Sequence, residues 1–274
     1  MRKIIKELTV SRESLPPNAY IGDEFAVNLG MTYSAGRAFR VGDPRRFNDG
    51  RMMRVLEGAI VYSINLQTFS LGKDDVIVVP PGVVVELVSI SDNICLQALS
   101  YKGDTTDRVL VASLTGDDVS EYGQGVLAIW RALHLDPQDV DCARYLYLSI
   151  LARIKYLSSR QETLSPSGRS GDIFRRFLAL VNEKASGSMR IPLYADALNI
   201  TPHYLSSLVK NVSGKSVMDY NRQAVIQRAK ILLRQGFTAT QAADDLDFPN
   251  LPYFNRFFKR HTGLTPGEYK RQKP

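Results

Sequence analysis

Residues 195–200 read Ala-Asp-Ala-Leu-Asn-Ile, and residues 243–248 repeat them as Ala-Asp-Asp-Leu-Asp-Phe. A second correspondence follows, between Tyr204-Leu-Ser-Ser-Leu-Val-Lys210 and Tyr253-Phe-Asn-Arg-Phe-Phe-Lys259, and Gly214 then corresponds to Gly263. The offset between the copies is 48 residues and then 49. Repetition at a fixed spacing indicates one supersecondary unit used twice, with one extra residue in the second copy.

Each copy predicts two helices joined by a sharp turn. A small alanine allows the helices to approach closely, and Asn199 or Asp247 then tolerates a left-handed backbone better than other non-glycine residues. The second helix is expected to begin at Thr201-Pro202 or at Asn250-Leu251-Pro252, where a capping side chain precedes an early proline, and to end at the glycine. This is the pattern of a helix-turn-helix, whose second helix enters the DNA major groove.

The second helix of each copy has an apolar and a polar face. We expect the apolar face to be core; it contains Leu205, Leu208, Val209 and Val212 in the first copy, and Phe254, Phe257 and Phe258 in the second. The polar face contains His203, Ser206, Ser207 and Lys210, or Pro252, Asn255, Arg256 and Lys259. An arginine pairs with guanine, an asparagine pairs with adenine, and small serines allow close approach to the bases. Lys210, Lys259 and Arg260 are suited to phosphates.

One helix is predicted between the two copies, from Val217 to Arg234. Its 18 residues, at about 1.5 Å each, span roughly 27 Å. Such a helix suits two recognition helices placed about one DNA turn apart, roughly 34 Å, so that one chain reads two successive major grooves.

Packed helix pairs without DNA binding are the alternative interpretation of this repeat. The charge distribution favours DNA. Residues 171–274 contain 16 Lys and Arg against 8 Asp and Glu, a net +8, and the preceding 170 residues contain 19 against 20, a net −1. A basic module beside a nearly neutral one indicates a polyanionic partner for the basic module alone.

From about residue 171 onward the chain resembles the C-terminal DNA-binding domain of the AraC family of transcription regulators. The resemblance rests on Tyr253-Phe-Asn-Arg-Phe-Phe-Lys-Arg260, His261-Thr-Gly263 and Leu264-Thr-Pro-Gly-Glu-Tyr269. It implies double-stranded DNA and RNA polymerase as partners, and it implies base contacts by His203, Ser206, Ser207, Leu251, Asn255 and Arg256. Two positions depart from the family pattern: Asp247 replaces the usual glycine, and Pro252 replaces a small polar residue and removes a polar contact.

The N-terminal half predicts a different fold. Residues 24–100 contain short β-branched segments broken by turns, as in Ala59-Ile-Val-Tyr-Ser-Ile-Asn65, Asp75-Val-Ile-Val-Val-Pro80 and Asn93-Ile-Cys-Leu-Gln-Ala-Leu-Ser100, which is typical of a small antiparallel barrel or sandwich. Residues 118–133 and 141–158 have helical periodicity. The expected fold is α+β and multidomain: a β-rich regulatory domain (1–110), helices that pack on it or on a second subunit (111–158), a linker (159–170) and an all-α DNA-binding domain (171–274).

The resemblance extends to a cupin-like barrel, which in many AraC-family regulators senses a small molecule and contributes to a homodimer. Residues 54–62 and 71–82 are similar to such a barrel. Tyr33, Arg37, Arg40 and Tyr62 are candidates to line a pocket, but ordinary packing explains them equally well, so no ligand site is predicted.

We predict no enzyme activity, no metal and no cofactor. Metal-dependent cupin enzymes need clustered histidines, and the only three here, His134, His203 and His261, lie outside the barrel segment. Cys95 and Cys142 have no partner at metal-ligand spacing, so we expect buried, reduced thiols. No run of eighteen uncharged apolar residues occurs, so we expect a cytoplasmic protein without a membrane partner.

The sequence therefore predicts a sequence-specific DNA-binding transcription regulator, controlled by a small-molecule effector in the N-terminal domain. The alternative is a constitutive DNA binder whose N-terminal barrel serves for dimerisation or for contact with another protein.

Overall fold

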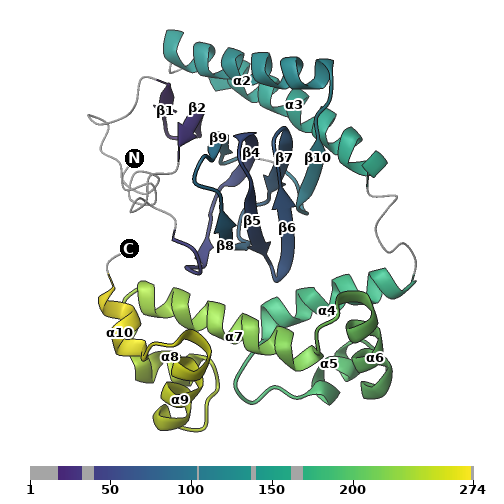
Figure 1. Cartoon of the computed structure of the whole chain (residues 1–274), viewed down its shortest axis with the longest axis vertical. Helices are drawn as coiled ribbons and strands as arrows, with labels where there is room; N and C mark the ends of the chain where they lie inside the picture. Colours follow the sequence, from purple (N-terminus) through teal and green to yellow (C-terminus); the bar gives the residue numbers. More distant parts are fainter. Residues whose placement is uncertain (1–17, 33–39, 104, 137–139, 162–168, 273–274) are drawn as a thin grey trace.

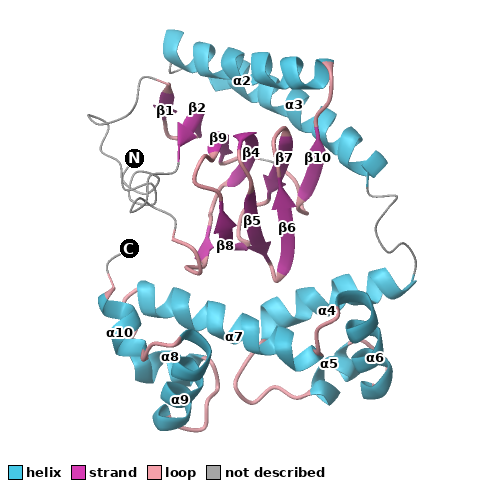
Figure 2. Ribbon diagram, in the orientation of Figure 1, coloured by secondary structure: helices cyan, strands magenta, loops and turns pink. Residues whose placement is uncertain are grey.

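The computed structural model describes residues 18–32, 40–103, 105–136, 140–161 and 169–272 (Figure 1). We call the described residues up to 161 the β domain and residues 169–272 the helical domain. Figure 2 shows the strands between two groups of helices, with α2 and α3 on one side and α4 to α10 on the other. The α+β class and the order of a β-rich part before an all-helical part are as the sequence predicts.

Two antiparallel sheets form the β domain. The larger has the order β1 (Ala19–Ile21), β2 (Phe25–Thr32), β9 (Cys95–Tyr101), β4 (Gly50–Glu57), β7 (Asp75–Val79) and β10 (Leu110–Ser113). The smaller has the order β3 (Arg45–Arg46), β8 (Val84–Ile90), β5 (Ile60–Ile64) and β6 (Gln67–Leu71). The three strands quoted from the sequence correspond to β5, β7 and β9, whereas β1 and β3, with three and two residues, are too short to show an alternating apolar pattern.

Residues 76–79, at the centre of the larger sheet, are buried on both of its faces. Ile77 and Val79 pack between the two sheets with side chains of β5 and β8. Val76 and Val78 point the other way and pack against α2 (Asp117–Leu135) and α3 (Val140–Gln161). A strand covered on both faces has a continuous apolar run rather than an alternating one, which explains this segment.

Helices α2 and α3 lie on the outer face of the larger sheet, each a few residues longer than predicted. Their buried side chains, such as Ile129 and Tyr147, belong to the same core as the strands. The sequence left open whether these helices pack on the sheet or on a second subunit, and the structure shows that they pack on the sheet.

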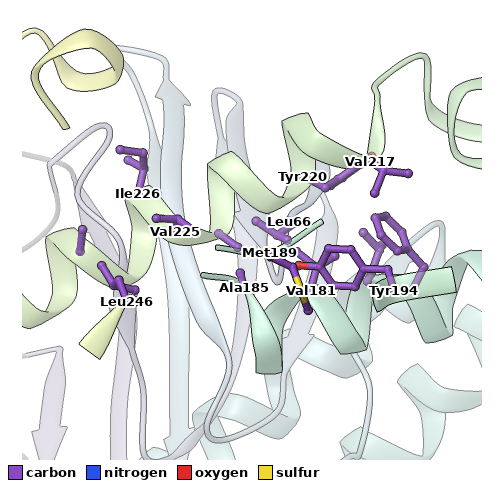
Figure 3. Packing of buried hydrophobic residues seen from close by; sticks show 14 of the residues in the cluster. Leu66, Val181, Ala185, Met189, Tyr194, Val217, Tyr220, Val225, Ile226 and Leu246 are labelled. Atoms are coloured by element: carbon purple, nitrogen blue, oxygen red, sulfur yellow. The ribbon is translucent and has the colours of Figure 1, made fainter. Parts of the chain in front are cut away.

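The helical domain contains α4 (Arg169–Lys184), α5 (Ile191–Ala197), α6 (Pro202–Ser213), α7 (Val217–Arg234), α8 (Ala239–Asp245), α9 (Leu251–Thr262) and α10 (Pro266–Arg271). The bounds of α7 match the prediction residue for residue. One continuous core joins all these helices, and Figure 3 shows part of it around Val181, Tyr194 and Val225.

Two expectations differ from the structure. The predicted linker 159–170 is shorter at both ends, because α3 continues to Gln161 and α4 begins at Arg169; residues 162–168 lie outside the described part. The cysteines are free but not buried: Cys95 is partly exposed, and Cys142 is exposed in the first turn of α3. An apolar neighbourhood in sequence did not place Cys142 on the inner face of its helix.

Two of the four pocket candidates, Tyr62 and Arg40, lie in the described residues. Tyr62 is buried among the sheets, where loss of solvation raises the pKa of its hydroxyl, and Arg40 is exposed. Tyr33 and Arg37 lie outside the described residues.

Candidate nucleic-acid interface

The turn between α5 and α6 has the backbone geometry that the repeat predicts. Asn199 has a φ of 54°, in the left-handed region, and the amide of Ile200 donates to the carbonyl of Ala195 at 3.0 Å. In the second unit, between α8 and α9, Asp247 has a φ of 55°, and the amide of Phe248 donates to the carbonyl of Ala243 at 3.0 Å. The two turns are therefore closed in the same way, and the prediction of a left-handed residue is confirmed at both sites.

Side-chain caps begin both recognition helices at the predicted residues. The Thr201 hydroxyl accepts a hydrogen bond from the amide of Tyr204 at 3.2 Å, and Asn250 Oδ1 accepts one from the amide of Tyr253 at 2.8 Å. These caps satisfy amides that have no partner within the helix. Each helix ends at a left-handed glycine, as the sequence indicates.

Core packing fixes which face of each recognition helix points outward. In α6, Leu205 and Val209 are fully buried, and in α9, Phe254 and Phe258 are fully buried. Phe248, in the turn, packs on Phe254 with ring centroids 5.2 Å apart. With these anchors inside, the opposite face of each helix is left to solvent.

The predicted base-contact residues lie on that outward face. His203, Ser207 and Arg256 are exposed, and the side chains of these three make no hydrogen bond or ion pair within the described part of the chain. Ser206, Leu251 and Asn255 are partly buried at the edge of the same faces, and the Ser206 hydroxyl donates to the carbonyl of Pro202 at 2.9 Å. Both helices therefore present polar groups near their N-terminal ends.

The predicted phosphate-binding side chains are exposed as well, but Lys210 already has a partner. Its Nζ donates to the carbonyl of Gly214 at 2.8 Å, at the C-terminal end of α6. Lys259, Arg260 and His261 lie together in the last turn of α9. Partial burial lowers the pKa of His261, and the positive charges of Arg222 and Arg260 lower it further, so the imidazole is more readily neutral there than in water.

The surface also presents side chains to which the sequence reasoning gave no role. Tyr204 and Tyr253 occupy matched positions on α6 and α9, and their side chains are 42% and 48% exposed. The sequence repeat aligns these two tyrosines, and packing in the hydrophobic core does not explain a tyrosine on the polar face of a helix. A groove of about 540 Å³ separates the units; Arg190 and Arg222 line it, together with Tyr253 and Phe257. These two arginines were hidden from sequence reasoning because only the tertiary fold brings them together.

No group of His, Cys, Asp and Glu side chains within the described ranges is arranged to hold a metal ion. In the same ranges, none of the helices has the length and apolar character needed to cross a membrane.

Residues 194–272 match the family model of a helix-turn-helix domain. The chain is 26% identical over 151 residues to the HTH-type transcriptional regulator YijO of Escherichia coli, covering 55% of this chain and 53% of YijO. It is 25% identical over 223 residues to the HTH-type transcriptional regulator YobQ of Bacillus subtilis, covering 78% of this chain and 83% of YobQ. The chain thus matches about half the length of YijO and most of YobQ.

Among solved structures, wild-type ToxT from Vibrio cholerae, with an unsaturated fatty acid bound to it, aligns over 91% of this chain and 95% of its own, with 16% identity and a TM-score of 0.45. A superposition this loose adds no argument about function. The relatives are described as transcriptional regulators rather than enzymes, in agreement with the expected absence of catalysis. The repeat, the two matched turns and the domain match together identify the C-terminal part of this chain as an AraC-type helix-turn-helix domain, and the chain as a relative of HTH-type transcriptional regulators.

Proposed function

We propose that this protein regulates transcription by placing α6 and α9 in two successive major grooves of double-stranded DNA. The observation that carries the proposal is the pair of matched units with exposed polar faces, joined by the 18-residue helix α7. A span of roughly 27 Å for α7 suits recognition helices about one DNA turn apart. The net charge of +8 on residues 171–274 supplies the attraction to the phosphates.

Base reading is assigned to His203, Ser206 and Ser207 from α6, and to Leu251, Asn255 and Arg256 from α9. Arg256 is the strongest of these, because its exposed guanidinium has no partner among the described residues and is available to donate two hydrogen bonds to one guanine. Lys210, Lys259 and Arg260 are assigned to phosphates. Lys210 exchanges its bond to Gly214 for a phosphate when DNA binds.

We assign the β domain to control of this activity through a small-molecule effector. Its near-neutral charge argues against a role in holding DNA. The expected setting is the cytoplasm, with RNA polymerase as the further partner that the family resemblance implies. An effector must bind the DNA-competent and incompetent forms with different affinities, so DNA affinity that no metabolite changes contradicts this assignment.

A constitutive DNA binder with an N-terminal interaction module is the second candidate, and the outward faces of α2 and α3 favour it. Leu135, Tyr145 and Tyr156 are 86%, 71% and 51% exposed there. Exposed apolar side chains on neighbouring helices suit a homodimer. Sedimentation of the full-length chain distinguishes the two candidate functions. A dimer whose assembly and DNA affinity do not change with any metabolite favours the interaction module.

The test of the main proposal is selection of DNA from a random pool by the full-length chain. We expect one enriched motif with two blocks whose centres are about 10 base pairs apart. An unenriched pool, with binding that disappears in moderate salt, indicates phosphate contact alone and contradicts sequence-specific regulation.

A further inference from the structure

The turn of the β5–β6 hairpin carries a leucine in a strained backbone conformation. Ile64 pairs with Gln67, so Asn65 and Leu66 form a two-residue turn, with φ values of 45° and 71°. Turns of this kind favour Asn-Gly, because both residues need positive φ. A bulky residue at the second position costs free energy and indicates that the surroundings hold it there.

Leu66 belongs to the core of the other domain. Its side chain is 1% exposed and packs in the hydrophobic cluster of the helical domain rather than in those of the β domain (Figure 3). The amide of Asn182, from α4, donates to the carbonyl of Asn65 at 3.1 Å, and Asn65 is in turn held by the amide of Val84 at 3.1 Å. The hairpin therefore enters the helical domain as a plug beside α4.

One polar face of α7 contacts the β domain along most of the helix. Gln223, Gln227, Lys230 and Arg234 follow one another at intervals of four, three and four residues, which places them on one side of a helix. We call these four residues the α7 stripe.

The first half of the α7 stripe binds the smaller sheet. Gln223 Nε2 donates to the Ser63 hydroxyl at 3.3 Å, and Gln227 Nε2 donates to Glu86 Oε2 at 2.6 Å. Lys230 lies 3.6 Å from Glu86 Oε1, with both side chains largely shielded from solvent.

The last residue of the stripe binds Asp43, beside the end of the helical domain. Arg234 Nε lies 3.3 Å from Asp43 Oδ1, and the Tyr269 hydroxyl of α10 donates to the same oxygen. Asp43 is only 4% exposed, and Arg234 and Tyr269 provide partners for its buried carboxyl group. The β domain is thus attached at two places: beside α4 through Leu66, and at the C-terminal end of α7, beside α10, through Asp43.

The recognition faces stay open while these contacts are made. His203, Ser207 and Arg256 are exposed, and in Figure 1 α7 lies between the β domain and α9, whereas α4 lies between the β domain and α6. The attachment therefore does not mask the DNA-binding surface. It acts instead on the helix that separates the two units.

We propose that the β domain is a clamp on α7, in which Leu66 and the α7 stripe fix the separation and orientation of the two recognition helices. This inference rests on the proposed function, and it assigns to Leu66, Asp43 and Glu86 a positioning role in DNA binding. The β5–β6 hairpin is then the element through which a change in the β domain reaches both recognition helices.

The test uses three full-length variants. Leu66→Gly removes the plug while giving the hairpin its preferred Asn-Gly turn, and Asp43→Asn removes the charge at the far end of α7. Gln67→Ala, at an exposed neighbouring position, is the matched control. Each is measured on duplexes that carry the blocks selected by the wild-type chain, at the selected spacing and with one or two base pairs inserted or removed; each base pair moves a block by about 3.4 Å and turns it by about 35°.

We expect Leu66→Gly and Asp43→Asn to lose about tenfold in affinity at the selected spacing and less at the others, so that the preference for one spacing flattens. Gln67→Ala keeps the wild-type profile. If the dependence of affinity on spacing is unchanged in both variants, the clamp is wrong. If both variants bind DNA more tightly than the wild type, the clamp is also wrong, and the β domain instead restrains DNA binding. If Leu66→Gly does not fold, Asp43→Asn decides in the same way.

A second measurement, without DNA, separates this inference from the proposed function. Hydrogen exchange in α4 and α7 is expected to be faster in Leu66→Gly than in Gln67→Ala, because the clamp then no longer restrains these helices. Equal exchange rates in the two variants contradict the clamp even if the full-length chain selects a DNA motif. Faster exchange in Leu66→Gly, together with a DNA pool that shows no enrichment, supports the clamp and contradicts sequence-specific regulation.

Discussion

A few individual residues define the proposed DNA-binding surface. Asn199 and Asp247 adopt the left-handed conformation that turns the chain between paired helices, and an outward Arg256 remains without a partner in the described structure. The Asp247 carboxylate also accepts a hydrogen bond from Ser188. This contact gives a physical reason for an aspartate where the family usually has glycine: the side chain ties the second turn to the loop that follows α4.

Substitution of Arg256 tests base reading. Arg256→Ala is expected to weaken binding to the selected site by about 1–3 kcal/mol and to leave binding to unrelated DNA nearly unchanged, because a bidentate guanine contact is lost. Titration of both duplexes at one salt concentration measures this. The control is Arg260→Ala, which should weaken both equally. Equal losses on both duplexes for Arg256→Ala contradict the assigned role.

Substitution of Asn199 tests the first turn. Asn199→Ala is expected to lower the free energy of unfolding by about 1–2 kcal/mol, because a Cβ without a local hydrogen-bonding group disfavours the left-handed region. Asn199→Gly should stay close to wild type, since glycine adopts positive φ without steric cost. Urea unfolding of both proteins measures the difference, and equal stability of the two variants counts against backbone conformation as the reason for asparagine.

At the scale of elements, α7 has two different partners. One side supplies Ala224, Val225 and Leu233 to the helical core, and the other side carries the α7 stripe that binds the β domain. Burial on both sides explains why Gln227, a polar residue, is 3% exposed in the middle of the helix. Its amide is satisfied by Glu86, as a buried polar group requires.

The start of α7 is fixed by a capping box, which gives a prediction at this scale. The Ser216 hydroxyl accepts from the amide of Asp219 at 3.1 Å, and Asp219 Oδ2 accepts from the amide of Ser216 at 3.0 Å. Ser216→Ala is expected to cost about 1 kcal/mol in the free energy of unfolding, whereas Ser216→Thr keeps the hydroxyl and most of the stability. Thermal or urea unfolding measures both, and equal losses in the two variants argue against the cap.

The same box predicts a dependence on pH. Hydrogen bonds from Ser216 lower the pKa of Asp219 below its ordinary value of 3.8. A lowered carboxyl pKa means that its stabilisation is present above pH 3.8 and is lost as the pH falls through the folded value. The difference in unfolding free energy between wild type and Asp219→Asn should therefore shrink below about pH 4. A difference that stays constant from about pH 7 to about pH 3 contradicts a role for the charge.

At the scale of the whole molecule, charge and attachment are divided between the domains. The part up to residue 170 carries a net −1 and the remainder +8, so the proposed attraction to DNA comes from one part and the proposed control of geometry from the other. Among the described residues, hydrogen bonds from the β domain reach α4, α7 and α10, and the outward faces of α6 and α9 stay exposed.

The concentration of charge predicts strong salt dependence. Binding to unrelated DNA should disappear as salt rises, while binding to the selected site persists further, because only base contacts escape counterion competition. Arg260→Ala should reduce the slope of log affinity against log salt by about one. Titration at several salt concentrations measures the slope, and a slope near zero contradicts a phosphate-dominated interface.

The duplicated helix-turn-helix, its caps and turns, and the bounds of α7 were predictable from the sequence, because these follow from local backbone preference and from apolar spacing along one chain segment. The sequence also indicated a β-rich first half, but the short strands β1 and β3 have too few residues for such a pattern. The folded structure was needed to show that Leu66 packs in the core of the helical domain, that Asp43 contacts Arg234 and Tyr269, and that Cys142 faces outward. The physical reason is that these contacts join residues as many as 226 positions apart, and the free energy that selects them comes from packing between domains, which no local pattern in the sequence records.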